Sequence, residues 1–439
     1  MSYLLNCIYL LIVTLLSPWL VYKAITTGKY RRGLWRKLTG QALLRDGNEP
    51  CVWFHGVSVG EIHLLRQVVA AFQTRHPDWD CVISTTTDTG FEEACKRFPN
   101  LHIFYWPFDF TWAVHRALWR VNPSLVVLAE GEFWPNFLTA ANTRGVPVAV
   151  INGRFSPRSS GRYMKLRWLA RRVLGRVDLF AVQTDDYAGI LRQLGIPSTR
   201  IHVTGSVKYD GVETNRANPK TQELAHLFGL EDPSRGLVWI AGSTQDPEEK
   251  IVLAIYARLQ KEFPELRLFL VPRQKERFDE VARLLEKSGL PFIRRSSLHS
   301  PLTTHNSPLT IPLVLVDTIG ELGALWGLAD VAFVGGSLDG RRGGQNMIEP
   351  AAYGAAVIFG PHVWNFRDTA DMLVAAGGSI QIQNDTDLEE VVRRLLYDVE
   401  ERERLGRNGR DFVLKQQGAT QRTIECLGQL VGSNLKEAA

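Results

Sequence analysis

Residues 51–61 read Cys-Val-Trp-Phe-His-Gly-Val-Ser-Val-Gly-Glu, a short apolar run followed at once by a glycine-rich turn. Short apolar runs bounded by turn residues are typical of strands that are buried on both faces of a sheet. The stretch therefore predicts a strand at 51–54, a turn, and a helix with Glu61 in its first turn. The fold depends on whether this unit recurs along the chain.

The unit recurs over the whole body of the chain. In the first half the predicted strands are 51–54, 82–85, 101–105, 125–129, 148–151, 179–182 and 201–204. After a polar linker at 211–220 they are 237–241, 266–271, 313–316, 331–334, 356–359 and 379–382, with an exposed loop expected at 296–308. Strands of this kind, separated by helices, indicate parallel sheets. We expect two doubly wound α/β domains facing a cleft, with ligands at the carboxyl ends of strands.

Composition excludes several classes of protein. The 439 residues suffice for two domains, and 45% hydrophobic with 22% charged residues is typical of globular chains. The net charge of +5 comes from 51 basic and 46 acidic side chains, which is too balanced for a dedicated nucleic-acid-binding protein. The five cysteines are widely spaced, so we expect neither a disulfide framework nor a zinc site.

The N-terminal segment predicts membrane attachment. Residues 3–22 form an apolar run long enough to cross a bilayer, so 1–22 is a candidate anchor and 23–48 a basic juxtamembrane segment. Six basic residues follow the run: Lys23, Lys29, Arg31, Arg32, Arg36 and Lys37. Their position favours a cytoplasmic body. A monotopic helix is the alternative, because four residues dilute the apolar run: Asn6, Thr14, Ser17 and Pro18.

The turn after the first strand allows three interpretations. Gly56-x-Ser58-x-Gly60 has the spacing of a serine-hydrolase nucleophile elbow. Alternatively Glu61, in the first turn of the helix, is a general base favoured by the helix dipole. It could also be a carboxylate that only complements that dipole. The motif alone does not decide among them.

Further charged residues follow two other predicted strands of the first half. Glu130 and Glu132 come directly after 125–129, and acids clustered at a strand end favour a functional role. Lys208 follows 201–204 beside the linker and could reach an anionic ligand, although a single lysine is more often simply solvated. Asp78 and Asp80 match a metal-binding DxD pattern, but they precede a strand, so we interpret them as turn residues.

The second half carries the pattern of a nucleotide site. Arg273 ends a strand with a guanidinium, and the segment 318–321 follows another strand. Glycines let the backbone approach a phosphate, and Asn346 can cap a helix whose amides face that anion. Glu349 could accept both hydroxyls of a ribose. The residues that we assign to this site are Pro272, Arg273, Ile319, Gly320, Glu321, Gly335, Gly336, Ser337, Asn346, Met347, Ile348 and Glu349.

Taken together, the sequence resembles the 3-deoxy-D-manno-octulosonic acid (Kdo) transferases of Gram-negative bacteria. The motifs that carry the resemblance run in order over almost the whole chain: HGVSVGE (55–61), STTTDTG (84–90), EGEFWPN (130–136), NGRFSPRS (152–159), VTGSVKYD (203–210), AGST (241–244), VPRQKERF (271–278), IGEL (319–322), FVGGSL (333–338), GGQNMIEPAAYG (343–354) and GPHVWNF (360–366). The chain departs from the family pattern at Gly56, Gly131 and Gln345, where Ser, Thr and His are usual.

The resemblance implies a GT-B glycosyltransferase of lipopolysaccharide and lipid A biosynthesis at the cytoplasmic face of the inner membrane. It implies an acceptor domain at 49–210, a CMP-Kdo domain at 221–417 and a C-terminal helix at 418–439 that returns to the first domain. By the family's pattern Glu61 corresponds to the general base, and Glu130 and Lys208 to residues that stabilise the transition state. The acceptor would be a lipid A precursor, with inversion at the sugar and with no cofactor or metal. Basic residues could face its phosphates: Arg31, Arg32, Arg36, Lys37, Arg158, Arg162 and Lys165.

Three rival functions stay open from the residues. A GT-B transferase could use a UDP-sugar, whose pyrophosphate would occupy the donor site. A membrane-anchored serine hydrolase would use Ser58 as its nucleophile. An anchored nucleotide sensor with a degenerate transferase body is weakened because Glu61, Glu130 and Lys208 are all present.

Overall fold

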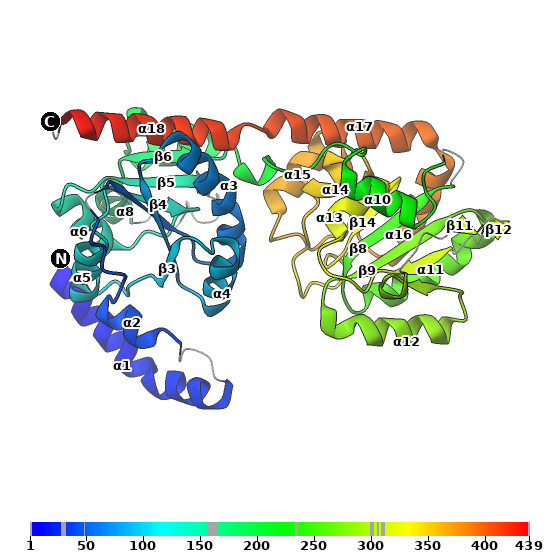
Figure 1. The fold of residues 1–439 in the computed structure, drawn as a ribbon, viewed down its shortest axis with the longest axis horizontal. Coiled ribbons are helices and arrows are strands. Elements are labelled where there is room, and N and C mark those ends of the chain that lie inside the picture. The colour runs from blue at the N-terminus through cyan, green and yellow to red at the C-terminus, as the bar shows by residue number, and fades with distance from the viewer. Residues whose placement is uncertain are drawn as a thin grey trace. The chain divides into compact units, whose positions relative to one another are not determined.

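The chain forms two compact units (Figure 1). The computed structural model describes residues 2–27, 32–47, 49–155, 161, 166–232, 236–298, 303–304, 307–308 and 312–437. The first unit comprises residues 1–210 together with 416–439, and the second comprises residues 211–415. The C-terminal helix therefore belongs to the unit that contains the N-terminus.

The first unit is built on a seven-stranded parallel sheet in the order β3-β2-β1-β4-β5-β6-β7. Its strands are β1 (Cys51–His55), β2 (Asp80–Thr85), β3 (His102–Tyr105), β4 (Leu125–Ala129), β5 (Val148–Gly153), β6 (Leu179–Val182) and β7 (Ile201–Val203). Every residue of β1, β4 and β5 is buried, because helices cover both faces of the sheet.

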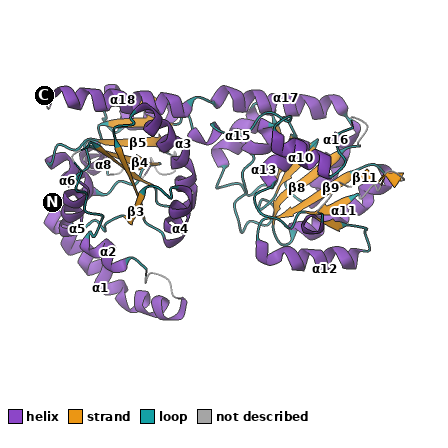
Figure 2. Ribbon diagram, in the orientation of Figure 1, coloured by secondary structure: helices purple, strands orange, loops and turns teal. Residues whose placement is uncertain are grey.

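Helices form two layers on this sheet (Figure 2). One apolar core includes residues of α5 (Thr111–Val121), α6 (Pro135–Thr143), α8 (Arg167–Leu174) and α9 (Asp185–Gln193). The other includes residues of α3 (Val59–Arg75), α4 (Asp88–Arg97) and α18 (Ala419–Glu437). Helices α1 (Ser2–Thr27) and α2 (Leu34–Thr39) precede the sheet, and short 3-10 turns flank β7: η1 (Ser198–Arg200) and η2 (Val207–Tyr209). The last helix of the chain thus completes a wall of the first core.

The second unit repeats this plan with the strand order β10-β13-β9-β8-β14-β15-β16, again parallel. The strands are β8 (Val238–Thr244), β9 (Arg267–Pro272), β10 (Ile293–Arg294), β13 (Leu313–Leu315), β14 (Val331–Val334), β15 (Ala356–Phe359) and β16 (Ser379–Gln381). A separate hairpin pairs β11 (Thr303–Thr304) with β12 (Ser307–Pro308).

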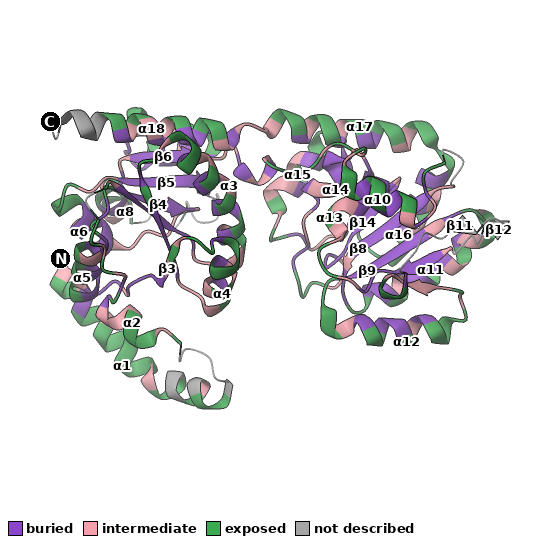
Figure 3. Ribbon diagram, in the orientation of Figure 1, coloured by how far each residue is buried: buried purple, intermediate pink, exposed green. Residues whose placement is uncertain are grey.

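The helices of the second unit are α10 (Pro219–Leu227), α11 (Glu248–Glu262), α12 (Phe278–Ser288), α13 (Leu322–Leu325), α14 (Ile348–Ala352), α15 (Arg367–Ala375), α16 (Asp385–Tyr397) and α17 (Val399–Gln416), with 3-10 turns η3 (Lys275–Arg277), η4 (Arg295–Ser297) and η5 (Trp326–Leu328). Helices α11, α12 and α16 contribute to one apolar core. The core residues of both sheets lie in the purple strands of Figure 3.

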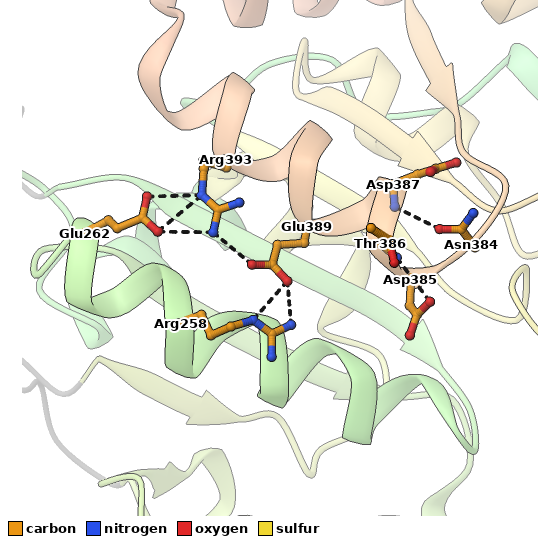
Figure 4. Close-up of polar contacts among 8 residues, drawn as sticks. All are labelled: Arg258, Glu262, Asn384, Asp385, Thr386, Asp387, Glu389 and Arg393. Atoms are coloured by element: carbon orange, nitrogen blue, oxygen red, sulfur yellow. Dashed lines mark hydrogen bonds and ion pairs between the residues drawn. The ribbon is translucent and has the colours of Figure 1, made fainter.

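Ion pairs join α11 to α16 at the surface of the second unit (Figure 4). Glu389 pairs with Arg258 at 2.5 Å and with Arg393 at 2.8 Å, and Arg393 also pairs with Glu262 at 3.1 Å. The side chain of Asn384 accepts a hydrogen bond from the amide of Asp387 at 3.0 Å, which caps α16. Isolated surface pairs contribute little to stability, whereas connected networks such as this one can contribute more.

The predicted pair of doubly wound parallel sheets is confirmed, and all the predicted strands are present within a few residues at their ends. The strand β10 and the hairpin β11–β12 were not predicted, because elements of two residues have no hydrophobic alternation that can be recognised in the sequence. The hairpin lies in the predicted loop 296–308, of which 299–302 and 305–306 fall outside the described residues.

The N-terminal helix contains the predicted apolar span. Residues 2–19 of α1 are long and apolar enough to cross a membrane, and few of them are buried by the protein. Two sets of basic residues were predicted, those that follow the apolar run and those that could face lipid phosphates, and the described ones are Lys23, Arg32, Arg36 and Lys37. Lys29, Arg31, Arg158, Arg162 and Lys165 lie outside the described residues.

The C-terminal helix is fixed to the first unit by the carboxylate of Asp210. This carboxylate accepts hydrogen bonds from the amides of Gly418 at 2.7 Å and Thr420 at 2.5 Å, at the start of α18. Arg422, one turn further on, donates to the carbonyl oxygen of Thr204 at 2.8 Å. The cap satisfies helix amides that would otherwise lack partners.

We predict that Asp210→Ala lowers the free energy of unfolding by about 1–2 kcal/mol, because the cap of α18 is lost. The measurement is chemical denaturation followed by circular dichroism. Asp46→Ala, at an exposed position, is the control and should stay within about 0.5 kcal/mol of the parent. Equal stability of the two variants would contradict the role given to Asp210.

Candidate active site

Glu61 stands at the third position of α3, and its carboxylate folds back onto the turn that precedes the helix. The amide of Val57 donates to Oε2 at 2.5 Å, and the hydroxyl of Ser58 donates to Oε1 at 3.3 Å. Because β1 ends in a glycine turn, the helix begins beside the carboxyl edge of the sheet. The strand and the turn together therefore place Glu61 where ligands bind in such folds.

Burial raises the pKa of Glu61 to about 7. The hydrogen bond from Val57 opposes this shift, while the negative charge of Glu130 adds to it. Desolvation and a like charge are two of the ways in which proteins move a carboxyl pKa toward neutrality. A carboxylate with a pKa near 7 can accept a proton from a hydroxyl group in neutral solution and release it afterwards.

Glu130 and Lys208 form an ion pair at the same edge of the sheet. Glu130 directly follows β4, Lys208 lies in η2 after β7, and Oε1 is 2.7 Å from Nζ. Both side chains are partly exposed, so the pair can also meet a ligand. The structure therefore brings together two of the predicted site residues that are 78 positions apart in the sequence.

Asn152, at the end of β5, joins this pair and was given no role in the sequence analysis. Its Nδ2 donates to Oε1 of Glu130 at 3.1 Å, and its Oδ1 accepts from the amide of Val207 at 3.1 Å. Gln183 donates to the backbone carbonyl of Asn152 at 2.9 Å. Asn152 thus positions the pair from within the protein. In the sequence, Asn152 could have been recognised as a candidate because it directly follows the predicted strand 148–151.

The backbone of this cluster is strained. Glu130 has a φ of 58° and Asn152 a φ of 51°, in the left-handed region that non-glycine residues seldom adopt. Such conformations cost about 1–3 kcal/mol each and cluster at functional sites. Gly131 follows with a φ of 118°, a backbone conformation that glycine adopts without the strain that a side chain would add.

Glu132, the second acid of the motif, is also partly desolvated. Burial raises its pKa. The negative charge of Glu132 in turn raises the pKa of Glu61 slightly. The negative charges of Glu130 and Glu132 therefore both raise the pKa of Glu61.

The geometry at Ser58 disfavours a serine hydrolase. A nucleophile elbow is a strained turn, whereas Ser58 has extended backbone with φ −119° and ψ 167°. Its hydroxyl donates to Glu61 rather than to a histidine. His55, the nearest histidine in the sequence, is buried and directs Nδ1 to Ser84 at 2.9 Å. Gly56 leaves room for Glu61, because a Cβ at this position would lie 3.1 Å from the Cβ of Glu61.

In the second unit, Asn346, Glu349 and Arg273 form a second cluster. Asn346 donates from Nδ2 to Oε1 of Glu349 at 3.0 Å and accepts from the amide of Ile348 at 3.1 Å. Burial raises the pKa of Glu349, while the hydrogen bond from Asn346 and the charge of Arg273 oppose the rise. Arg273 is exposed at the end of β9, where its guanidinium is free to meet an anion.

The segment 319–321 lies close to this cluster. A Cβ added at Gly323, two residues further on, would stand 3.9 Å from Oε2 of Glu349. Ile319 is 73% exposed, Gly320 has a φ of 92°, and Glu321 pairs with Arg295 at 2.7 Å. The segment thus presents an exposed apolar side chain and a glycine turn near Glu349.

The glycine loop 335–337 serves a different purpose from the one expected. The amides of Gly336 and Ser337 donate to the carboxylate of Glu248 at 2.6 and 2.9 Å, and the amide of Leu338 donates to it at 3.1 Å. A Cβ at Gly335 would lie 2.7 Å from Oε2 of Glu248, which explains that glycine. Because a protein carboxylate occupies these amides, they are not free to hold a phosphate.

Three other predicted site residues have mainly a packing role. The side chains of Met347 and Ile348 are buried in the unit, and Pro272 is buried at the end of β9. Only their backbone groups can meet a ligand. Gln345, which departs from the family pattern, packs over the loop, since a Cβ on Gly336 would lie 3.3 Å from its Nε2.

Comparison with known proteins identifies the family of this chain. The family model described as 3-deoxy-D-manno-octulosonic-acid transferase (kdotransferase) matches residues 29–211. The 3-deoxy-D-manno-octulosonic acid transferase of Haemophilus influenzae is 34% identical over 89% of this chain and 90% of its own length. The chain belongs to the Kdo transferase family. The Kdo transferase of Bordetella pertussis is also 34% identical, over 87% of each chain.

This member of the Kdo transferase family is therefore a glycosyltransferase. Its two parallel sheets are those of the GT-B fold. The crystal structure of Acinetobacter baumannii MurG covers 87% of this chain and 99% of its own length with a TM-score of 0.55. At 14% sequence identity that likeness concerns the fold alone.

We predict that Glu248→Gln lowers the free energy of unfolding by about 2–3 kcal/mol, because an amide nitrogen replaces an oxygen that accepts loop amides. The measurement is chemical denaturation of the full chain. Glu276→Gln, at an exposed position, is the matched control and should leave stability unchanged. A Glu248→Gln protein as stable as this control would show that the loop does not depend on the carboxylate.

Proposed function

We propose that this Kdo transferase moves Kdo from CMP-Kdo to a lipid A precursor, with inversion at the sugar, in lipopolysaccharide biosynthesis. The observation that carries the proposal is the carboxyl edge of the first sheet, where Glu61, with a pKa of about 7, lies in the field of the Glu130–Lys208 pair. The names of the relatives supply the transferred sugar.

Glu61 would act as the general base. An inverting transfer needs one group to take the proton of the acceptor hydroxyl as the bond to the sugar forms. The proton moves to the carboxylate of Glu61, the C–O bond of the donor breaks, and CMP leaves with the bonding electrons. The amide of Val57 and the hydroxyl of Ser58 hold the carboxylate in one orientation for this step.

Lys208 and Glu130 would stabilise the charge that develops during transfer. Lys208 supplies a positive charge, and Glu130, with Asn152, fixes the position of the ammonium group. Groups oriented before the reaction cost no reorganisation when charge develops, and for this reason they contribute strongly to the rate.

The donor would occupy the cluster of the second unit. Arg273 suits the single phosphate of CMP-Kdo, since a guanidinium donates two parallel hydrogen bonds to such a group. Glu349, held by Asn346, would accept hydrogen bonds from the ribose hydroxyls. The segment 319–321 would lie beside the nucleotide. We assign no phosphate contact to the amides of Gly336 and Ser337, because Glu248 accepts from them.

The acceptor resides in a membrane, and the chain has features that suit such a substrate. We place the enzyme at the cytoplasmic face of the inner membrane, with α1 as its membrane attachment. The basic residues that follow α1 would attract anionic lipid. A UDP-sugar donor is the second candidate, because the same elements could hold a pyrophosphate.

The first test is transfer by detergent-solubilised protein that is given a lipid A precursor and CMP-Kdo generated in the reaction. Mass spectrometry of the lipid should show one or more Kdo increments. We expect Glu61→Gln to lower the rate about 100- to 10,000-fold, because the base is lost. CMP binding should be unchanged.

Ser58→Ala is the matched control for this loss. It should keep most of the transfer rate, because the amide of Val57 still holds the carboxylate of Glu61. If Ser58→Ala abolished the rate and Glu61→Gln did not, the assignment of the base would be wrong and a serine nucleophile would return.

The pH dependence of transfer provides a second prediction. The base acts only when it is ionised, so kcat/KM should rise about tenfold per pH unit below pH 7 and level off above it. The residual rate of Glu61→Gln should lack this rise. A wild-type rise centred near pH 4.5 would mean that burial does not raise the pKa of Glu61 in the enzyme, and a rise that persists in Glu61→Gln would mean that another group titrates.

Isothermal titration of the full chain with CMP and with UDP separates the two donors. We expect binding of CMP with a dissociation constant well below that of UDP, and Arg273→Ala should weaken it. Tighter binding of UDP would overturn the CMP-Kdo assignment and favour a UDP-sugar.

A further inference from the structure

Helix α1 is attached to the first unit by its own first turns. Asn6 is only 7% exposed, although it lies in an otherwise apolar helix. Its Nδ2 donates to Oγ1 of Thr111 at 2.8 Å, and its Oδ1 accepts from the amide of Thr111 and from Nδ2 of Asn136, both at 3.2 Å. These bonds join α1 to the beginnings of α5 and α6.

Tyr9, one turn later on the same face, extends the attachment. Its hydroxyl donates to Oδ2 of Asp109 at 3.0 Å, and its ring packs edge-on against Phe110 at 6.0 Å. Asp109 is buried and also accepts from the amides of Asn136 at 3.0 Å and Phe137 at 2.8 Å. We call Asn6, Tyr9, Asp109, Thr111 and Asn136 the polar node.

Beyond the polar node the helix is exposed and apolar. Figure 3 shows α1 mostly in the colour of exposed residues. The exposed large apolar side chains are Tyr3, Leu4, Ile8, Leu10, Leu11, Ile12, Val13, Leu15, Leu16, Trp19, Tyr22 and Ile25. A continuous apolar surface of this kind requires an apolar medium. At this place, ahead of a basic segment, that medium is lipid.

The polar node conflicts with a helix that crosses the bilayer. From Asn6 to Lys23 the helix rises about 25 Å, close to the thickness of the hydrocarbon core. If α1 stood upright with Lys23 at one interface, Asn6 would lie near the opposite side. Thr111, Asp109 and Asn136 would then have to enter the membrane with it, although they belong to a sheet-bearing domain. A helix lying along one leaflet removes this conflict.

Two further helices of the same layer present membrane-seeking side chains. The exposed face of α5 carries Trp112, which is 45% exposed, and Trp119, which is 61% exposed. On α8, Trp168 is 68% exposed and is followed by the exposed Arg171 and Arg172. Tryptophan at the headgroup level and arginine toward anionic lipid are the side chains that membrane surfaces favour.

We propose that α1 lies within one leaflet, beside α5 and α8, and that the N-terminus stays on the same side of the membrane as the first unit. The partner is an anionic phospholipid surface, which contacts α1, α5 and α8 together. This inference rests on the membrane location in the proposed function and concerns orientation, which that function leaves open.

The first experiment compares the sides on which two cysteines lie in living cells. A hydrophilic Gly-Ser tag with one cysteine precedes the full chain. The exposed Cys7 and Cys95 and the partly buried Cys426 are replaced by serine. A second variant has no tag cysteine and retains Cys95 on α4 as the marker of the first unit. Spheroplasts are treated with a membrane-impermeant maleimide before and after permeabilisation.

We expect the tag cysteine and Cys95 to behave alike, with labelling of both only after permeabilisation. Labelling of the tag in intact spheroplasts, with Cys95 protected, would show that α1 spans the bilayer and would overturn the proposal. The comparison does not depend on transferase activity, so it stands if the proposed reaction is wrong.

The second experiment tests α8 on the same surface. Full-length protein is floated with vesicles of phosphatidylethanolamine and phosphatidylglycerol at a 7:3 ratio. Arg171→Gln/Arg172→Gln should bind about 25-fold more weakly, since each arginine near an anionic surface contributes about a fivefold effect. The matched control is Arg404→Gln/Arg410→Gln, two exposed arginines on α17.

Equal weakening of both double variants would mean a general charge effect and would overturn the role of α8. The α8 variant should keep the wild-type transfer rate in detergent micelles, where no anionic surface is present. A loss of transfer in micelles would instead place Arg171 or Arg172 in acceptor binding.

Discussion

The ammonium group of Lys208 allows two carboxylates to share one edge of the first sheet. Glu130 is 2.7 Å from Nζ of Lys208, while the negative charge of Glu130 still reaches Glu61 and adds to the effect of burial on its pKa. The pair connects the end of β4 to the turn after β7, and Asn152 bonds to both segments. Strained backbone at Glu130 and Asn152 persists because these contacts determine it on several sides. Asp210, two residues after Lys208, accepts a hydrogen bond from the amide of Gly418 and so joins the same turn to the start of α18.

The two units treat buried carboxylates differently. In the first, Glu61 accepts one strong amide bond and a long hydroxyl bond, so burial prevails and the group can exchange a proton. In the second, Glu248 accepts from four backbone amides, those of Gln245, Gly336, Ser337 and Leu338, and these hydrogen bonds oppose the rise in its pKa that burial causes. The glycine loop that follows β14 was expected to bind a phosphate, and its amides instead donate to the carboxylate of Glu248. The donor site that we propose instead lies at Arg273 and Glu349, and the charge of Arg273 lowers the pKa of Glu349 against the effect of burial.

The strands were predictable from sequence because a buried parallel strand is a local apolar run, and Val331–Val334 or Val148–Ile151 can be recognised without reference to any partner. Glu61, Glu130 and Lys208 were candidates because each follows such a strand within a few residues. Asn152, Asp109 and Asn6 were not recognised as structural partners. Their roles depend on contacts with residues tens to a hundred positions away, such as Asn6 with Thr111, which no local pattern contains. For the same reason the role of Glu248 could not be predicted, since the loop amides that it binds lie 88 to 90 residues further along the chain.

Helix α18 also has a consequence for the order in which the protein is made. Ile424, Leu427 and Val431 are buried in the apolar core of the first unit, together with residues of α3. The second unit, residues 211–415, leaves the ribosome as a continuous segment and has all of its own strands at that point. The first unit begins synthesis earlier but lacks one wall of its core until the last twenty or so residues emerge. The half of the protein that is translated first is therefore the half that completes its packing last, and a ribosome that stops short of α18 leaves that core open to solvent.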